Sequence, residues 1–495
     1  MNKNNERHRS SLRASSLIAL STLGLISVAL AGCTVGPDFT RPEAPRVADY
    51  TSTPYTTQTV AAPIALGQTQ QIQTGLAVEA QWWHAFGSLA LDRLIEQALT
   101  HSPTLAAAQA TLRQAEEIYA AQAGSTQYPQ INAGLNAQRQ QFNPSALGQG
   151  GESKTFNLYN PNISLGYNLD LVGGNRRALE ALAARTEYSR FELEAAKLTL
   201  ASSLVATAIR RAQFADQIQA TRVIVQNQEA QLKLTQDRLR LGQAALDEVL
   251  TLQTQLEQVR ATLPQLTTQW QQTEHLLAVL AGQAPGASEI PAFTLADFNL
   301  PAKLPLMIPS ALARSRPDIQ AAEALLHAAN ADYGVALAKL YPQINLSASL
   351  GSQALTTGAL FGGSSTVWNM VGQLTQPLFN PGLPAEKRAA LAALDAAAAH
   401  YQGVVLEALR SVADSLRSIE NDAQVLQHLA AADSAAQAAM QSVSRQYKLG
   451  AASYVQLLIA EQQAQQVRIN LIAAQSQRLI NSAALYQALG CGMGA

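Results

Sequence analysis

The sequence predicts an α+β membrane protein with two internal repeats, each holding a β-hairpin and long coiled-coil helices. Three observations carry this prediction. The pentapeptide Tyr-Pro-Gln-Ile-Asn occurs twice, at 128–132 and 341–345. Residues 176–241 contain no glycine or proline, and 385–449 contain only Gly403. Stretches of alternating apolar and polar residues follow each pentapeptide. Self-similarity at a fixed spacing is the signature of a duplicated unit.

The first 32 residues are predicted to be a secretion signal. Four basic residues precede an apolar stretch from Leu17 to Leu30, and two small residues then lead into Cys33. This order is typical of bacterial signal peptides. Because the cleavage point resembles that of a lipoprotein, we expect Cys33 to carry covalent lipid, with an ordinary signal peptide as the alternative. Cys491, the only other cysteine, then has no intrachain disulfide partner.

Composition argues against several other classes of protein. The net charge of −1 provides no basic surface for nucleic acid. No purely apolar run reaches eighteen residues, so no transmembrane helix is predicted. The seven histidines are scattered, and no zinc-protease motif or glycine-rich phosphate loop occurs. We therefore predict no enzyme activity, no metal site and no cofactor beyond the lipid on Cys33.

Domain boundaries follow from landmarks that recur 208 residues apart. Gly242 matches Gly450, and Gly282 matches Gly490. The predicted organisation is a signal peptide (1–32), a lipidated linker (33–87), repeat 1 (88–282), a second linker (283–308), repeat 2 (309–490) and a tail (491–495).

Each repeat is predicted to open with a helix that stops at Tyr-Pro, because proline disfavours helix at the residue before it. The hydrophobic period then changes to two, which predicts β-hairpins at about 128–172 and 341–379. Such strands are typical of a transmembrane barrel wall with lipid on one face and water on the other. Alternation alone equally allows two soluble hairpins that cover a core.

The long stretches at 176–241 and 385–449 are each predicted to form one helix of roughly 100 Å. A return helix follows each Leu-Gly turn, so each pair resembles a coiled-coil hairpin. Pro264 is expected to kink or break the first return helix.

Strand number requires several chains if the hairpins lie in a membrane. Four strands cannot close a barrel, since the smallest membrane barrels need about eight. An open sheet edge in lipid would leave backbone N–H and C=O groups unpaired. Three chains would supply twelve strands and a tube of helices.

The sequence also resembles the TolC-like outer-membrane factors of tripartite efflux systems of the RND type, in the NodT-type group of lipoproteins. The resemblance covers nearly the whole mature chain. It rests on Cys33–Phe39 with Arg41-Pro42, Trp82-Trp83 with Phe86, Leu91–Ile95, Ser315–Ile319 with Ala322-Glu323, both Tyr-Pro-Gln-Ile-Asn segments and Gln376–Phe379.

The resemblance implies a homotrimer with a 12-stranded β-barrel in the outer membrane and an α-helical tunnel in the periplasm. It further implies contact with a periplasmic adaptor (membrane fusion) protein and an inner-membrane efflux pump. The expected function is a passive exit channel for drugs or other small solutes. The alternatives are a lipid-anchored coiled-coil scaffold without a pore, or an exit duct for metal ions or type I secretion.

The resemblance also implies a gate at the periplasmic helix turns. Related channels carry an acid where this chain has Ile459. We therefore expect an apolar gate at Val455 and Ile459, with a charged ring from Glu461 or from the first hairpin as the alternative. Arg445 and Tyr447 are either helix-end residues or a lock on the closed tip. The predicted tip and gate residues are Gly242, Asp247, Glu248, Arg445, Tyr447, Gly450, Val455 and Ile459.

Overall fold

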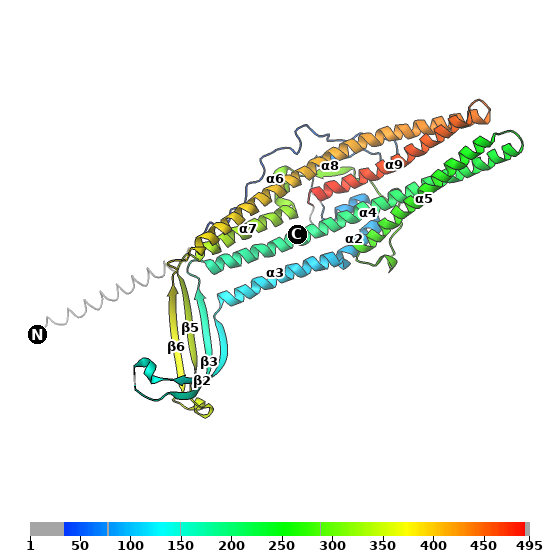
Figure 1. Ribbon diagram of the computed structural model, residues 1–495. Helices are drawn as coiled ribbons and strands as arrows, with labels where there is room; N and C mark the ends of the chain where they lie inside the picture. Colours follow the sequence, from blue (N-terminus) through cyan, green and yellow to red (C-terminus); the bar gives the residue numbers. More distant parts are fainter. Residues whose placement is uncertain (1–33, 77–78, 149, 288, 491–495) are drawn as a thin grey trace. The chain divides into compact units, whose positions relative to one another are not determined.

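The computed structural model describes residues 34–76, 79–148, 150–287 and 289–490, and its elements repeat in two halves (Figure 1). The first half contains α2 (Leu89–His101), α3 (Pro103–Gln127), β2 (Gln130–Phe142), β3 (Lys154–Leu169), α4 (Gly174–Arg240) and α5 (Leu246–Leu280). The second contains α6 (Pro309–Ser315), α7 (Pro317–Ala338), β5 (Gln343–Ser352), β6 (Thr366–Thr375), α8 (Gly382–Lys448) and α9 (Tyr454–Ala488).

The four long helices match between the halves residue for residue. Helices α4 and α8 each have 67 residues, and α5 and α9 each have 35. Helices α8 and α9 each start and end 208 residues after α4 and α5; for example, α4 starts at Gly174 and α8 at Gly382. The duplication predicted from the sequence is therefore confirmed at the level of whole helices.

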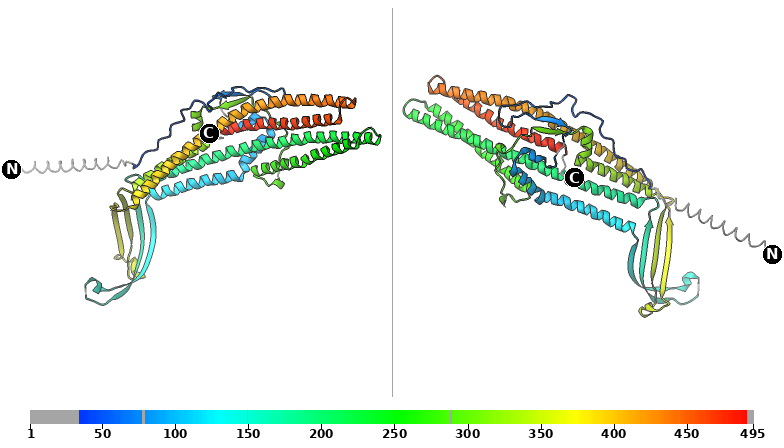
Figure 2. Two further views of the ribbon diagram at one scale, coloured as in Figure 1. Left: turned by 45° about the horizontal axis from the view of Figure 1, so that its top comes forward. Right: turned by 180° about the vertical axis from the view of Figure 1, so that it is seen from behind.

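The chain divides into two compact units. The strand unit comprises the chain up to Arg41 together with Arg113–Glu187 and Glu323–His400, and the helical unit comprises Pro42–Leu112, Tyr188–Ala322 and the chain from Tyr401. Both views in Figure 2 show β2, β3, β5 and β6 side by side as one sheet. Its order is β2-β3-β5-β6, and every neighbouring pair is antiparallel.

The register of this sheet separates its two faces by polarity. Residues that pair across neighbouring strands point to the same face. Two apolar rows cross the sheet: Ile131, Leu165, Ala348, Met370 and Ala133, Ile163, Leu350, Trp368. A polar row on the opposite face contains Asn132, Ser164, Ser349 and Asn369.

The apolar face of the sheet is uncovered within one protomer. Met370 is 79% exposed, Trp368 75% and Leu135 74%. A soluble hairpin pair would bury such a face against a core, so the exposure favours a wall that meets lipid. The strands of the first β-hairpin are longer than those of the second, with 13 residues in β2 and 16 in β3 against 10 each in β5 and β6.

Two details of the helices bear on the predictions for Pro264 and for membrane-spanning helices. Helix α5 continues through Pro264, so no break occurs there. Proline has no N–H, so the Arg260 carbonyl, four residues before Pro264, loses its usual helix donor. Pro264 and Arg260 are both exposed, and water can donate to that carbonyl instead. By length and composition alone, α8 also contains a stretch apolar enough to cross a membrane, although only 11% of that stretch is buried. The prediction of no transmembrane helix rests on a stricter criterion, an uninterrupted run of eighteen apolar residues, which α8 does not contain.

The N-terminal linker packs into the helical unit around a buried arginine. Arg478 of α9 is 1% exposed and donates to the Leu66 carbonyl at 2.9 Å, the Gln68 carbonyl at 2.7 Å and Thr59 Oγ1 at 3.0 Å. Burial lowers the pKa of Arg478 to about 10, so the side chain stays a cation at neutral pH. Gln475 of α9 also donates to the Ala65 carbonyl at 2.9 Å, and Ser482 of α9 accepts from Gln70 Nε2 at 2.9 Å, so Arg478 is the centre of a set of contacts that holds the linker on α9.

Arg478→Met should loosen this linker between residues 59 and 68, where its three acceptors lie. We expect a loss of about 2–5 kcal/mol of stability, because each buried acceptor left without a donor costs about 1–3 kcal/mol. The measurement is limited proteolysis between residues 57 and 70, with thermal unfolding of the purified protein. Arg222→Met, at an exposed position of α4, should change neither. Equal protease resistance in the two variants would show that the linker is held by other contacts.

Candidate functional site

Glycine closes both helical turns at the tip in the same way. Gly242 and Gly450 have φ of +73° and +76°, the left-handed conformation that glycine adopts without steric cost. The Gly242 N–H donates to the Leu239 carbonyl at 3.0 Å and the Gln243 N–H to the Arg238 carbonyl at 2.8 Å. Gly450 and Ala451 repeat these two bonds at the same distances. Both turns are therefore Schellman caps, which end α4 and α8 sharply.

The return helices begin differently at the two turns. Ser453 and Gln456 form a reciprocal capping box at the start of α9. The N-cap of α5 is Ala245, which has no side-chain acceptor. Asp247 and Glu248 lie in the first turn of α5, where the helix dipole favours negative charge. Two acidic residues at this position can therefore serve to stabilise the start of α5, and they need not form a charged ring at the tip.

An arginine joins the two hairpins close to their turns. Arg238 of α4 donates from Nη1 to the Tyr447 hydroxyl of α8 at 3.0 Å, and its guanidinium lies 5.7 Å from the centre of the Tyr447 ring. Tyr447 in turn packs edge-on against Tyr454, with ring centres 5.9 Å apart. Tyr447 therefore bridges the first hairpin and the start of α9.

Sequence reasoning named Tyr447 and missed Arg238. Arg238 could have been selected by the same criterion as Arg445, because each lies in the last turn of a long helix, Arg238 in α4 and Arg445 in α8. Arg445 is exposed, and within the part of the chain that the structure describes its side chain has no hydrogen-bond or ion-pair partner.

Val455 and Ile459 form an apolar pair on the outer surface of α9. They are 59% and 57% exposed, and their spacing of four residues places them on one helix face. Tyr454 and Leu457 are buried on the other side of the same helix turns. The positions 208 residues earlier, on α5, are Asp247 and Thr251. The first helical hairpin therefore carries polar side chains where the second carries apolar ones.

Glu461 does not share the face of Val455 and Ile459. It lines a groove between α4, α8 and α9, and burial raises the pKa of its carboxyl to about 7. Among the described residues, no group of three or more histidine, cysteine, aspartate or glutamate side chains lies close enough to hold a metal ion.

Cys33 lies outside the described residues, but the segment that follows it is docked in the strand unit. Arg177 of α4, almost fully buried, donates to the Val35 and Gly36 carbonyls at 3.3 and 3.2 Å and to Asp38 at 2.7 Å. The Phe39 ring stacks on His327 of α7, with centres 4.3 Å apart. The chain is thus fixed from the second residue after Cys33.

Comparison with known proteins assigns the family. The family model described as outer membrane efflux protein matches residues 94–283 and 308–491. The pyoverdine export outer membrane protein OpmQ of Pseudomonas putida is 31% identical over 421 residues, covering 84% of this chain and 88% of that protein. The outer membrane protein OprJ of Pseudomonas aeruginosa is 30% identical over 474 residues, covering 94% and 95%.

A solved structure supports the same assignment. The outer-membrane channel OprN superposes with a TM-score of 0.84 at 28% identity, over 93% of this chain and 100% of that one. Members of this family are transport proteins of the outer membrane and not enzymes. The two repeats, the sheet with its apolar face and the long helical hairpins agree with that assignment, and the chain belongs to the outer membrane efflux protein family.

Proposed function

We propose that three copies of this chain form the outer-membrane exit channel of a tripartite efflux pump, through which small organic solutes pass passively from periplasm to exterior. The observation that carries this proposal is the four-stranded sheet with an uncovered apolar face and two open edges. Strands β2 and β6 each have only one partner strand among the described residues. In lipid, each unpaired backbone group on such an edge would cost several kcal/mol.

Strand direction fits closure by copies of the same chain. Because neighbouring strands alternate in direction, β6 of one chain would lie antiparallel to β2 of the next. Three chains then give a closed antiparallel barrel of twelve strands, within the size range of outer-membrane barrels. The apolar rows of all three sheets would form one band facing lipid.

Native mass spectrometry of the detergent-purified protein tests the shared barrel. We expect the mass of three chains and no stable monomer, because a monomer would expose both edge strands. A monomer that keeps its full strand content would contradict the proposal.

The helical hairpins are proposed to form the tunnel wall and to meet a periplasmic adaptor protein and an inner-membrane pump. Support comes from family membership, since outer membrane efflux proteins work in tripartite pumps. A pore-free scaffold is disfavoured because it has no use for an apolar sheet face. Relatives at 30–31% identity are named for pyoverdine export, antibiotic efflux and toluene efflux. Small organic solutes are therefore proposed as cargo in preference to metal ions or secreted proteins.

The gate is proposed to lie at the tip, where three copies of Val455 and Ile459 would ring the tunnel axis. A narrow ring of apolar side chains blocks ions by excluding water and needs no charge. The Arg238–Tyr447 hydrogen bond would hold the two hairpins of each chain together in the closed state. The competing gate is a charged ring of Asp247 and Glu248.

Lipid on Cys33 is proposed as a second anchor beside the barrel. The docked segment after Cys33 supports this, because it fixes the start of the mature chain on the strand unit. Mass spectrometry of the N-terminal peptide should show cleavage before Cys33 and a diacylglycerol adduct. Cys33→Ser should remain in the membrane, since the barrel alone suffices to hold it there. An unmodified Cys33, or cleavage elsewhere, would refute the lipid anchor.

A further inference from the structure

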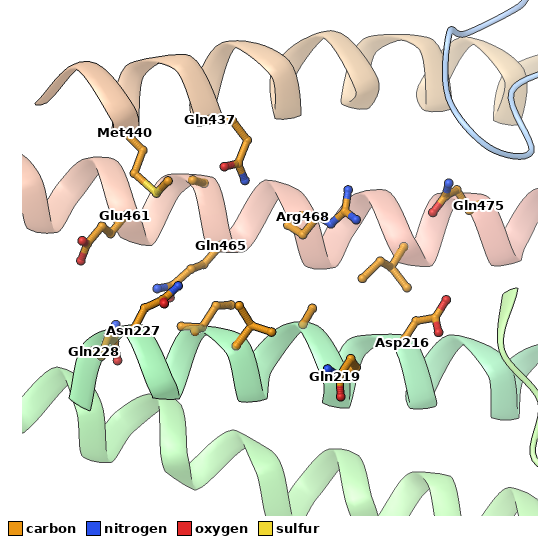
Figure 3. A pocket seen from close by; sticks show the side chains of 15 residues that line it. Asp216, Gln219, Asn227, Gln228, Gln437, Met440, Glu461, Gln465, Arg468 and Gln475 are labelled. Carbon is orange, nitrogen blue, oxygen red and sulfur yellow. The ribbon is translucent and has the colours of Figure 1, made fainter. Parts of the chain in front are cut away.

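A groove between the two helical hairpins has no role in the function proposed so far. It lies in the helical unit, is lined by α4, α8 and α9, and encloses about 500 Å³. Figure 3 shows Glu461 and Gln465 of α9 near Asn227 and Gln228 of α4 at one end, with Asp216 toward the other. The volume is that of a pocket for a small organic molecule.

Two polar groups at this end of the groove lack partners. Gln228 is only 3% exposed, yet its Nε2 and Oε1 atoms have no hydrogen-bond partner among the described residues. Buried amides almost always pair, so an unpaired one marks a place where a ligand group or water belongs. Glu461, on the opposite hairpin, has no cation among the described residues near enough to offset its burial, which alone raises its pKa.

The charge and lining of the groove select the kind of ligand. Asp216 and Glu461 both line it, and Arg468, its one cation among the described lining residues, lies 3.6 Å from Asp433. The groove therefore has an excess of acid. Apolar side chains also line it, namely Val223, Ile224, Met440 and Ile472. A cationic head with an apolar tail matches this combination, whereas an anion would meet a carboxyl at either end of the groove.

We propose that this groove binds a primary ammonium ion with an apolar tail, with the ammonium between Glu461 and the Gln228 side-chain carbonyl. An ammonium has three N–H donors and no acceptor, so it can donate to the Glu461 carboxylate and to Gln228 Oε1 together. Charge-assisted hydrogen bonds of this kind are about twice as strong as neutral ones. The tail would lie along Met440 and the α4 side chains. Such a ligand would touch both hairpins and tie them together.

Binding of this ligand should depend on pH through Glu461. Its carboxyl has a raised pKa of about 7, so it is largely ionised at pH 8 and largely protonated at pH 6. Of the other titratable groups, Tyr454 on α9 interacts with both Glu461 and Glu248 of α5, whereas Asp216 on α4 and the Asp433–Arg468 pair lie farther along the groove. We expect affinity to be roughly tenfold lower at pH 6 than at pH 8, because only the ionised acid pairs with the ammonium.

Calorimetric titration of the full-length protein in lipid nanodiscs tests the proposal, with empty nanodiscs as the blank. The probe is 4-phenylbutylamine, and 4-phenylbutanol is its uncharged counterpart. We expect saturable binding of the amine and at least tenfold weaker binding of the alcohol. Glu461→Gln, which keeps the shape of the side chain, should weaken the amine at least tenfold and remove the pH dependence. Glu257→Gln, at an exposed position of α5, should leave amine binding unchanged.

A second variant guards against misfolding of the first. Gln228→Leu removes the acceptor on α4 and should weaken the amine several-fold while leaving its pH dependence in place. Equal binding of amine and alcohol, or unchanged amine affinity in a folded Glu461→Gln protein, would overturn the site. Neither outcome would bear on the trimer or the tip gate, because the groove lies within one chain.

Discussion

Replacing Met370 by arginine is expected to remove most of the protein from the outer membrane. Met370 lies near the middle of β6 and belongs to an apolar row that crosses all four strands. An arginine on the lipid face near the bilayer midplane costs about 2–4 kcal/mol per copy. A trimer would bear that cost three times. The measurement is the membrane fraction that migrates as a heat-modifiable oligomer in SDS electrophoresis.

Asn369→Arg is the matched control for this prediction. Asn369 is the preceding residue of the same strand and lies in the polar row on the opposite face, where Ser349 Oγ is 2.8 Å from its side-chain oxygen. A charge there would meet water in the barrel lumen, so membrane assembly should be nearly that of the parent. If both arginine variants insert equally well, the sheet does not separate lipid from water as we propose.

The double change Val455→Ser with Ile459→Ser is expected to raise the resting conductance of the purified channel several-fold. Both side chains are more than half exposed in one chain, and serine in their place would let water wet a narrow ring. Helix α9 should persist, because Ser453 and Gln456, which cap it, are unchanged. Planar-bilayer recording of the trimer gives the measurement.

One control and one further variant complete the test of an apolar against a charged gate. Cys33→Ser should conduct as the parent does, because lipid does not contribute to the constriction. Asp247→Asn with Glu248→Gln removes the charge of the first tip and should have a smaller effect than the double serine variant. If the acid pair opens the channel while the serine pair does not, the constriction is electrostatic and belongs to the first hairpin.

Much of the fold could be read from local pattern. The absence of glycine and proline from 176–241 predicts one helix, and α4 has nearly those bounds. The turn glycines are equally local, since a left-handed cap needs little beyond its own residue. Pro264 shows the limit of such rules, because its effect depends on whether water reaches the freed carbonyl. That is a property of the packed helix and not of the proline.

The candidate sites were less accessible to sequence reasoning. Alternation predicts which strand residues share a face, but the order β2-β3-β5-β6 depends on pairing between distant parts of the chain. The Arg238–Tyr447 bond and the groove of Gln228 and Glu461 likewise join residues more than 200 positions apart. No periodicity within either helix contains that information. The 208-residue offset aligns the repeats without saying which of their faces meet.

The equal lengths of the paired helices limit how this chain can change length over evolution. One residue inserted into α4 would advance its turn by about 1.5 Å and rotate it by about 100°. Tyr447 of α8 would then no longer meet Arg238, and two turns that now end at matching positions would be out of step. Insertions or deletions in α4 should therefore be accompanied by equal ones in α8, and in the return helices as well. A homologue with a longer first hairpin is expected to carry a second hairpin longer by the same number of residues.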